Sequence, residues 1–219
     1  MRRLILLRPK PGLSQSAERA RALGLQVVEC PLFRIEPMTW SAPDAEEFDA
    51  LLLTSANAVQ YGGAELSKLM QLPVKAVGEA TAEAAREAGF YVDEIGNSDV
   101  ATLLAPVPER MRLLHLAGLD HIAIDDRRID RRIVYRSAEI EEPGPLPIEG
   151  AVVAVHSARA GARLKQLAEV KNSTAVVAIS SAAASACGPG WLQIEVAAAP
   201  NDKCLLALAA MLCHTSAPK

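Results

Sequence analysis

The 219-residue sequence predicts an α/β fold made of two similar lobes, each with a parallel sheet flanked by helices. Short apolar runs alternate with helical segments along the chain, which is the pattern of βα units and of parallel sheets. The pattern also occurs twice. Residues 49–55 resemble residues 150–157, and residues 74–78 resemble residues 176–180. Such internal similarity indicates two units of the same architecture.

Each expected element follows from a local signal. Strands are expected at residues 4–7, 26–30, 50–54, 74–77, 91–95, 112–116, 131–137, 151–156, 175–179 and 193–197. Helices are expected at 14–22, 79–88, 100–105, 158–167 and 205–212, with a short one ending at Cys187. We expect Ser14, Asp99 and Asp202 to cap the first, third and last of these, because short polar side chains bond the free N–H groups of a first turn.

The composition describes a folded protein with no general attraction to polyanions. Hydrophobic residues make up 50% and charged residues 22%, which excludes wholesale disorder. The net charge of -3 gives no reason to expect binding to nucleic acid or to an anionic membrane. The apolar run at the start is too short for a signal peptide, and no run is long enough to span a bilayer. We therefore expect a cytoplasmic protein.

Several kinds of site have no signal in the sequence. The four cysteines, Cys30, Cys187, Cys204 and Cys213, show no zinc-ligand spacing, so buried thiols and no metal are expected. There is no GxGxxG, P-loop or GxSxG motif, which leaves a nucleotide site or a nucleophile elbow unsupported. His156 and Ser157 are adjacent, but neighbours on a strand point to opposite faces, so a catalytic dyad is not expected.

Small and hydroxyl residues follow the predicted strands. They occur at 8–9, 54–55, 77–78, 117–118, 156–157 and 179–180. Ligands of open parallel sheets bind at this edge, where free backbone N–H groups favour anions such as carboxylates or phosphates. For any one of these residues, however, an ordinary helix cap is the preferred interpretation.

Two further features have structural interpretations. Arg127, Arg128, Arg131 and Arg132, interrupted by aspartates, are expected to form a solvated helix face. Trp40 and Trp191 are expected in the core or at its rim.

The motifs together resemble one known family. They are Arg8-Pro9, Thr54-Ser55-Ala56-Asn57-Ala58-Val59, Val77-Gly78-Glu79-Ala80-Thr81-Ala82, Val134-Tyr135-Arg136, Ile179-Ser180 and Ala199-Pro200. In this order and over nearly the whole chain, they resemble the uroporphyrinogen-III synthases. Each motif is weak alone, and the ordered set is the specific signal.

The resemblance implies a division of the chain that the repeat alone does not give. One lobe would comprise residues 1–33 and 140–219, and the other residues 38–132. The segments 34–37 and 133–139 would form a two-stranded connection between them.

The resemblance also implies the reaction, which is cyclisation of hydroxymethylbilane with inversion of ring D and loss of water. The product would be uroporphyrinogen III, a precursor of haem and other tetrapyrroles, and no cofactor would be needed. The enzyme must hold a linear tetrapyrrole with eight carboxylates in a reactive shape, which is catalysis by orientation. A monomer that binds this small molecule is expected.

The resemblance assigns roles to particular residues. Tyr135 would donate a proton to the departing hydroxyl, although packing between the lobes is an alternative role for it. The substrate-binding residues would be Arg8, Ser55, Ala56, Asn57, Gly78, Thr81, Gly118, Ser157 and Ser180. The chain departs from the family pattern at His156, at Ala183 and at Leu119-Asp120-His121.

Two other functions are compatible with parts of the sequence. A non-enzymatic, two-lobed protein that binds a small anion is the main alternative. A nucleotide or phosphotransfer enzyme comes third, and the missing phosphate loop counts against it.

Overall fold

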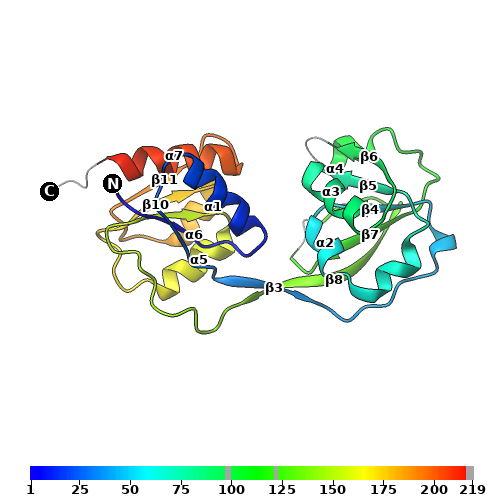
Figure 1. The fold of residues 1–219 in the computed structure, drawn as a ribbon, viewed down its shortest axis with the longest axis horizontal. Helices are drawn as coiled ribbons and strands as arrows, with labels where there is room; N and C mark the ends of the chain where they lie inside the picture. Colours follow the sequence, from blue (N-terminus) through cyan, green and yellow to red (C-terminus); the bar gives the residue numbers. More distant parts are fainter. Residues whose placement is uncertain (97–99, 121–122, 216–219) are drawn as a thin grey trace. The chain divides into compact units, whose positions relative to one another are not determined.

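The computed structural model describes residues 1–96, 100–120 and 123–215. The chain divides into two compact units (Figure 1). The terminal unit comprises Met1–Arg34 and Glu139–Lys219, and the central unit comprises Ile35–Ala138. The chain passes from one unit to the other after Arg34 and again after Ala138.

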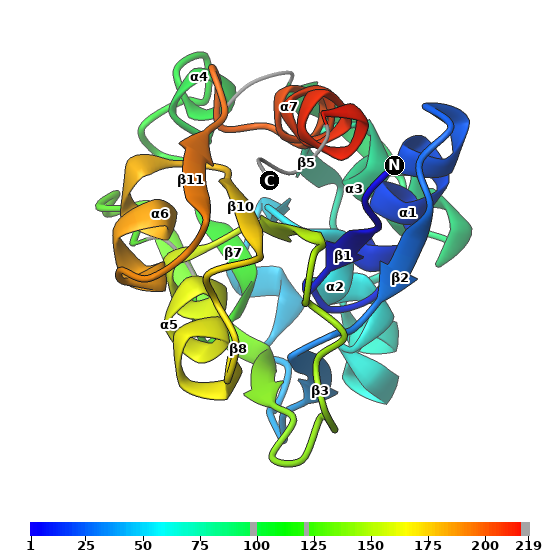
Figure 2. The same cartoon turned by 90° about the vertical axis from the view of Figure 1, so that its left-hand side faces the viewer.

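The terminal unit is a five-stranded parallel sheet with helices on both faces. Its strands, in spatial order, are β11 (Gln193–Val196), β10 (Ala175–Ala178), β9 (Val152–Val155), β1 (Leu4–Leu6) and β2 (Val27–Glu29). Helices α1 (Gly12–Ala22) and α7 (Asp202–His214) cover one face, and α5 (Ala158–Leu167) and α6 (Ser181–Cys187) cover the other (Figure 2). Leu4 and Leu6 belong to the first core and Ile5 to the second, because side chains alternate along a strand.

The central unit is a six-stranded sheet. Its order is β3 (Phe33–Pro37), β8 (Ile129–Glu139), β7 (Leu113–Gly118), β4 (Ala50–Leu53), β5 (Val74–Val77) and β6 (Val92–Gly96). One face packs against α2 (Ala56–Gln60), the 3₁₀ segment η2 (Gly63–Leu69) and α3 (Glu79–Glu87); a shorter 3₁₀ turn, η1 (Ala45–Glu47), precedes β4. The opposite face packs against α4 (Val100–Leu104). Leu51 and Leu53 point to the first of these cores, and Ala50 and Leu52 to the second.

The two sheets share one spatial order, but the chain enters it at different points. Strands β9, β10 and β11 correspond to β4, β5 and β6, while β1 and β2 correspond to β7 and β8. The strand registers also agree. Val152 in β9 corresponds to Ala50 in β4, and these residues pair with Leu4 in β1 and Leu113 in β7, respectively. The units are therefore circular permutations of one another. The predicted α/β class, with parallel sheets flanked by helices, is confirmed.

Several local predictions were wrong. Helix α1 begins at Gly12 after Pro11 with no side-chain cap, so Ser14 lies inside the helix. Asn201 caps α7 by accepting from the Cys204 N–H, and Asp202 is the first helical residue. The expected cap Asp99 and the departure at His121 lie outside the described residues.

The arginine cluster is also not a helix face. Arg127 and Arg128 lie in a turn, and Arg131 and Arg132 belong to β8, because the following Ile-Val-Tyr run fixes this segment as a strand. Both tryptophans take structural roles, as expected. The indole of Trp40 donates to Gly62 O at 2.8 Å, and that of Trp191 to Cys187 O at 3.0 Å.

The described part of the chain contains no helix that is both long enough and apolar enough to cross a membrane.

Candidate active site

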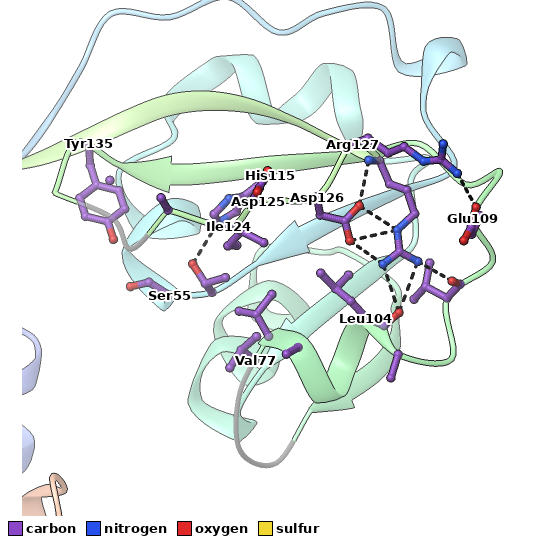
Figure 3. A pocket seen from close by; sticks show the side chains of 18 residues that line it. Ser55, Val77, Leu104, Glu109, His115, Ile124, Asp125, Asp126, Arg127 and Tyr135 are labelled. Carbon is purple, nitrogen blue, oxygen red and sulfur yellow. Dashed lines mark hydrogen bonds and ion pairs between the residues drawn. The ribbon is translucent and has the colours of Figure 1, made fainter.

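The central sheet has a topological switch point between β4 and β7. From β4 the chain adds β5 and β6 on one side, and then β7 and β8 on the other. Ligands of open α/β sheets bind at the carboxyl ends of the strands at such a point. Thr54, which follows β4, and His115, in β7, meet here, with 3.0 Å between Thr54 Oγ1 and His115 Nε2 (Figure 3).

A cavity of about 1150 Å³ lies at this place. It is lined by Ser55 after β4, by Val77 and Gly118 at the ends of β5 and β7, and by Tyr135, which pairs with Gly118 from within β8. Helix α4 and residues 123–128 complete the wall (Figure 3). This volume slightly exceeds the roughly 300–1,000 Å³ that is typical of small-molecule sites. It therefore has room for part of a large ligand.

The cavity exists because one crossover lacks a helix. In the terminal unit, α1 follows β1 and lies beside α7 on the same face. In the central unit, β7 and β8 are joined by residues 119–128, whose described part contains no helix, although parallel strands are usually connected by one. In the described part of the unit, the five-residue α4 is the only helix on this face.

Two of the predicted site residues, Tyr135 and Gly118, lie together at the cavity. They pair across β8 and β7, next to a shift in the strand register. A Cβ atom on Gly118 would lie 2.6 Å from Tyr135 Cε2 and Cζ and 2.9 Å from its hydroxyl. The half-buried phenol also packs against the core on the α2–α3 side of the sheet. The absence of a side chain at Gly118 thus sets the position of the phenol.

The strand-end serines are helix caps, which confirms the preferred interpretation of each. Ser55 Oγ accepts from Asn57 N at 3.2 Å, Ser157 Oγ from Ala160 N at 3.1 Å, and Ser180 Oγ from Ala183 N at 3.3 Å. A hydroxyl that accepts a hydrogen bond keeps its own hydrogen for donation. Capping and ligand binding are therefore compatible at these positions.

Other predicted residues of the central unit do not face the cavity. Among the described residues, the cavity wall includes Ser55 and does not include Ala56, Asn57, Gly78 or Thr81. Thr81 is buried in α3, with 5% of its surface exposed. Gly78 has a φ of 85°, which favours glycine, and it turns β5 into α3.

In the terminal unit, Arg8 lies in a polar cluster at the equivalent switch point, between β1 and β9. Asp202 is its centre. It accepts from Ser16 Oγ at 2.7 Å, from Arg19 at 2.8 Å and from His156 Nε2 at 2.9 Å. The Arg8 guanidinium donates to Ser16 Oγ at 3.0 Å and lies 3.5 Å from Asp202 Oδ1.

The cluster carries a net positive charge. Burial alone would raise the pKa of Asp202, but hydrogen bonds from His156, Ser16 and Arg19 hold that pKa well below its usual range. Burial lowers the pKa of His156, and the nearby Asp202 opposes this shift only in part. A neutral histidine, one carboxylate and two guanidiniums leave an excess of one positive charge. Such a cluster can attract a carboxylate.

Sequence reasoning missed three residues that the structure brings to these sites. His115 interrupts the apolar run Leu113–Gly118, and a polar residue inside a buried strand is a usable signal. Arg131 contacts His115 from the next strand, which becomes evident only after β8 is recognised. Asp202 meets Arg8 from 194 positions away, and no local pattern reveals this.

No metal site is evident in the part of the chain that the structure describes. No group of three or more His, Cys, Asp or Glu side chains is arranged to hold an ion there. All four cysteines are free thiols, and burial raises the pKa of Cys187 and of Cys213 to about 11.

The fold and the sites define a class, namely a two-unit α/β protein with polar groups at the carboxyl ends of its parallel strands. The family model described as uroporphyrinogen-III synthase HemD matches residues 14–207. The chain belongs to the uroporphyrinogen-III synthase family. It is an enzyme that cyclises hydroxymethylbilane in tetrapyrrole biosynthesis. The family match gives no support to the non-enzymatic alternative.

One solved structure supports the fold. The uroporphyrinogen-III synthetase of Helicobacter pylori 26695 aligns over 97% of this chain and 100% of its own, with a TM-score of 0.67 and 18% identity. A mutant uroporphyrinogen III synthase of the extremely thermophilic bacterium Thermus thermophilus aligns over 97% and 99%, with a TM-score of 0.49 and 18% identity. A search of curated proteins gave no match.

Proposed function

We propose that this enzyme cyclises its substrate mainly by orienting it at the strand ends, with Tyr135 as the proton donor. The observation that carries this proposal is the phenol of Tyr135, which Gly118 admits to the edge of a cavity at the switch point. A phenol at the wall of a large cavity can reach a bound hydroxyl group. Correct orientation of the reacting atoms can lower the activation free energy by as much as roughly 7–11 kcal/mol.

The proton has a defined destination in the reaction. The hydroxyl of hydroxymethylbilane leaves as water and therefore needs one proton, and an electrophilic azafulvene remains. The substituted α-carbon of ring D then bonds to the azafulvene methylene and forms a spiro intermediate. Its bond to the methylene bridge of ring C breaks, and the free α-carbon of ring D bonds to that bridge, so ring D is inverted. A proton is lost from the carbon framework, so the net change is loss of one water. A positioned phenol contributes to the first step by general acid catalysis.

The remaining site residues act in binding. In the central unit, the resemblance assigns Ser55 and Gly118, which line the cavity, and also Ala56, Asn57, Gly78 and Thr81, which lie outside the cavity wall. In the terminal unit, it assigns Arg8, Ser157 and Ser180. The serine hydroxyls and the Arg8 guanidinium are donors, and carboxylates accept from such groups. We further propose that the enzyme works in the cytoplasm as a monomer, without metal, cofactor, nucleic acid or membrane.

The Tyr135→Phe variant tests the proposed role of the phenol. Phe keeps the ring against Gly118, so stability should be nearly unchanged, while kcat should fall about a hundredfold, the usual scale of a lost general acid. The measurements are kcat, the affinity for product and the urea unfolding midpoint. A kcat within twofold of the parent would assign Tyr135 to packing alone.

A further inference from the structure

We propose that the cavity beside α4 in the central unit is a subsite for one carboxylate side chain of the tetrapyrrole. Thr54 is its hydrogen-bond donor, and His115 and Arg131 are positioning residues that orient the Thr54 hydroxyl. The proposal rests on the proposed function, because it takes hydroxymethylbilane as the ligand. The resemblance assigned a role to none of these three residues, although Thr54 is one of the hydroxyl residues noted at the strand ends.

His115 occupies a position that is apolar in the other unit. Leu113 in β7 corresponds to Leu4 in β1 by register, so His115 corresponds to Leu6. Both side chains are buried, with 1% and 0% of their surfaces exposed. A leucine satisfies this position in the terminal unit, whereas burying an imidazole is unfavourable unless its nitrogens are hydrogen-bonded. The fold alone therefore does not require a histidine here.

The contacts of His115 define its protonation. Arg131 Nε faces His115 Nδ1 at 3.4 Å. A guanidinium can only donate, so Nδ1 must be the acceptor and carry no hydrogen. The ring is then neutral with its hydrogen on Nε2, which lies 3.0 Å from Thr54 Oγ1 and donates to it.

This arrangement directs the Thr54 hydroxyl. A threonine hydroxyl has one hydrogen and two lone pairs, and one lone pair is used by His115. The hydroxyl hydrogen therefore points elsewhere, and Thr54 lines the cavity. The group that a ligand meets at this end of the cavity is thus a hydrogen-bond donor. The positive charge of Arg131, on the far side of the imidazole, polarises it further in favour of an anion.

A carboxylate on a short apolar arm fits these surroundings. Val77, Leu104 and Ile124 supply apolar wall to the cavity that Thr54 also lines. The acidic groups that also line the cavity are neutralised or hydrated. Asp126 is ion-paired with Arg128, Glu109 with Arg127, and Asp125 is exposed to solvent. The end of the cavity at Thr54 is accordingly the part that accepts an anion.

The Thr54→Val and Thr54→Ser variants test the donor. Valine keeps the β-branched shape and removes the hydroxyl, while serine retains it. We expect Thr54→Val to raise KM for hydroxymethylbilane about tenfold or more, as for a lost hydrogen bond to a charged group, with a smaller change in kcat. Thr54→Ser should keep KM within about threefold of the parent on the same scale. A KM within twofold of the parent in Thr54→Val would overturn the subsite.

A double-mutant cycle tests the positioning role. His115→Leu installs the residue found at the corresponding position of the other unit. It should raise KM in the parent and add little in the Thr54→Val background, because His115 acts through Thr54. If the two substitutions changed KM by independent factors that multiply in the double variant, His115 would not act through Thr54. Thr174→Val is the control, since it removes another buried hydroxyl, bonded to Ile148 O at 2.7 Å, and should leave KM unchanged.

The tautomer can be read directly by ¹⁵N NMR of the parent protein, whatever the stability of the His115→Leu variant. The His115 imidazole should be neutral with its hydrogen on Nε2, and Arg131→Met should weaken this preference. A His115 protonated on Nδ1 in the parent contradicts the arrangement. If the parent makes no type III product, the proposed function fails; if it does and Thr54→Val is unaffected, the subsite alone fails.

Discussion

Gly118 and Tyr135 show how one missing side chain positions a functional group. The phenol lies where a Cβ of residue 118 would lie, and the strand register shifts at the same place. The family resemblance assigned both residues to the site, but it does not show that the phenol of Tyr135 lies against the backbone of Gly118. That contact depends on which strands are neighbours.

Gly118→Ala should therefore act through Tyr135. The added methyl meets ring atoms at 2.6 Å, so the ring must move. We expect a loss of stability of about 1–3 kcal/mol, as in other overpacked sites. We also expect a fall in kcat like that of Tyr135→Phe. Adding Gly118→Ala to Tyr135→Phe should lower kcat little further. An unchanged kcat in Gly118→Ala would show that the phenol position is not critical.

His156 should make stability depend on pH. Its pKa in the folded state lies below the unfolded value of about 6.5, mainly because of burial. At pH values below the unfolded pKa, the unfolded chain binds a proton that the folded chain does not. The free energy of unfolding therefore falls as the pH is lowered through this pKa, and the loss disappears at higher pH.

The variant His156→Thr should flatten this dependence between about pH 5 and 7.5, the range around the unfolded histidine pKa. Urea unfolding at several pH values measures it. The exposed His214, changed to Gln, is the control and should leave the parent slope in place. Equal slopes in parent and His156→Thr would contradict the assigned shift.

The strands were easier to predict than the helix ends. Apolar runs such as Leu113–Gly118 and Val152–Val155 are buried throughout, so a strand is evident without knowledge of the neighbours. Helix starts depend on tertiary partners. Asp202 has the chemistry of a cap, yet it bonds Ser16, Arg19 and His156 instead, and Asn201 caps the helix. The prediction for the arginine segment was wrong because its many charged residues gave no apolar pattern at the start of β8.

Helices α5 and α6 approach closely at Gly161, and this contact can be tested. A Cβ there would lie 2.7 Å from Ala183 O, a backbone atom that cannot easily move aside. Gly161→Ala gains helix propensity of up to about 1 kcal/mol. We expect overpacking of about 1–3 kcal/mol to outweigh this gain.

The reverse change at the neighbouring exposed site is the matched control. Ala162→Gly should lose about 1 kcal/mol through helix propensity alone. Chemical denaturation of both variants measures the two effects. If Gly161→Ala raised the free energy of unfolding, the α5–α6 contact would not be as tight as described.

The permutation explains what the sequence could not tell about the whole molecule. The repeat indicated two similar units, but β1 and β2 precede β9 in one unit, whereas their counterparts β7 and β8 follow β4 in the other. A linear comparison therefore cannot assign segments to units, and only the resemblance implied a division. In the described residues of the central unit, no helix between β7 and β8 corresponds to α1, and the cavity lies on this face of the sheet.

The most direct test of the account is the isomer that the protein forms from enzymatically generated hydroxymethylbilane. Water alone closes the linear tetrapyrrole without inverting ring D and gives the type I isomer. Orientation at the strand ends, with a proton from Tyr135, should give type III uroporphyrinogen at an unchanged rate after treatment with a chelator. Formation of the type I isomer alone would contradict the account.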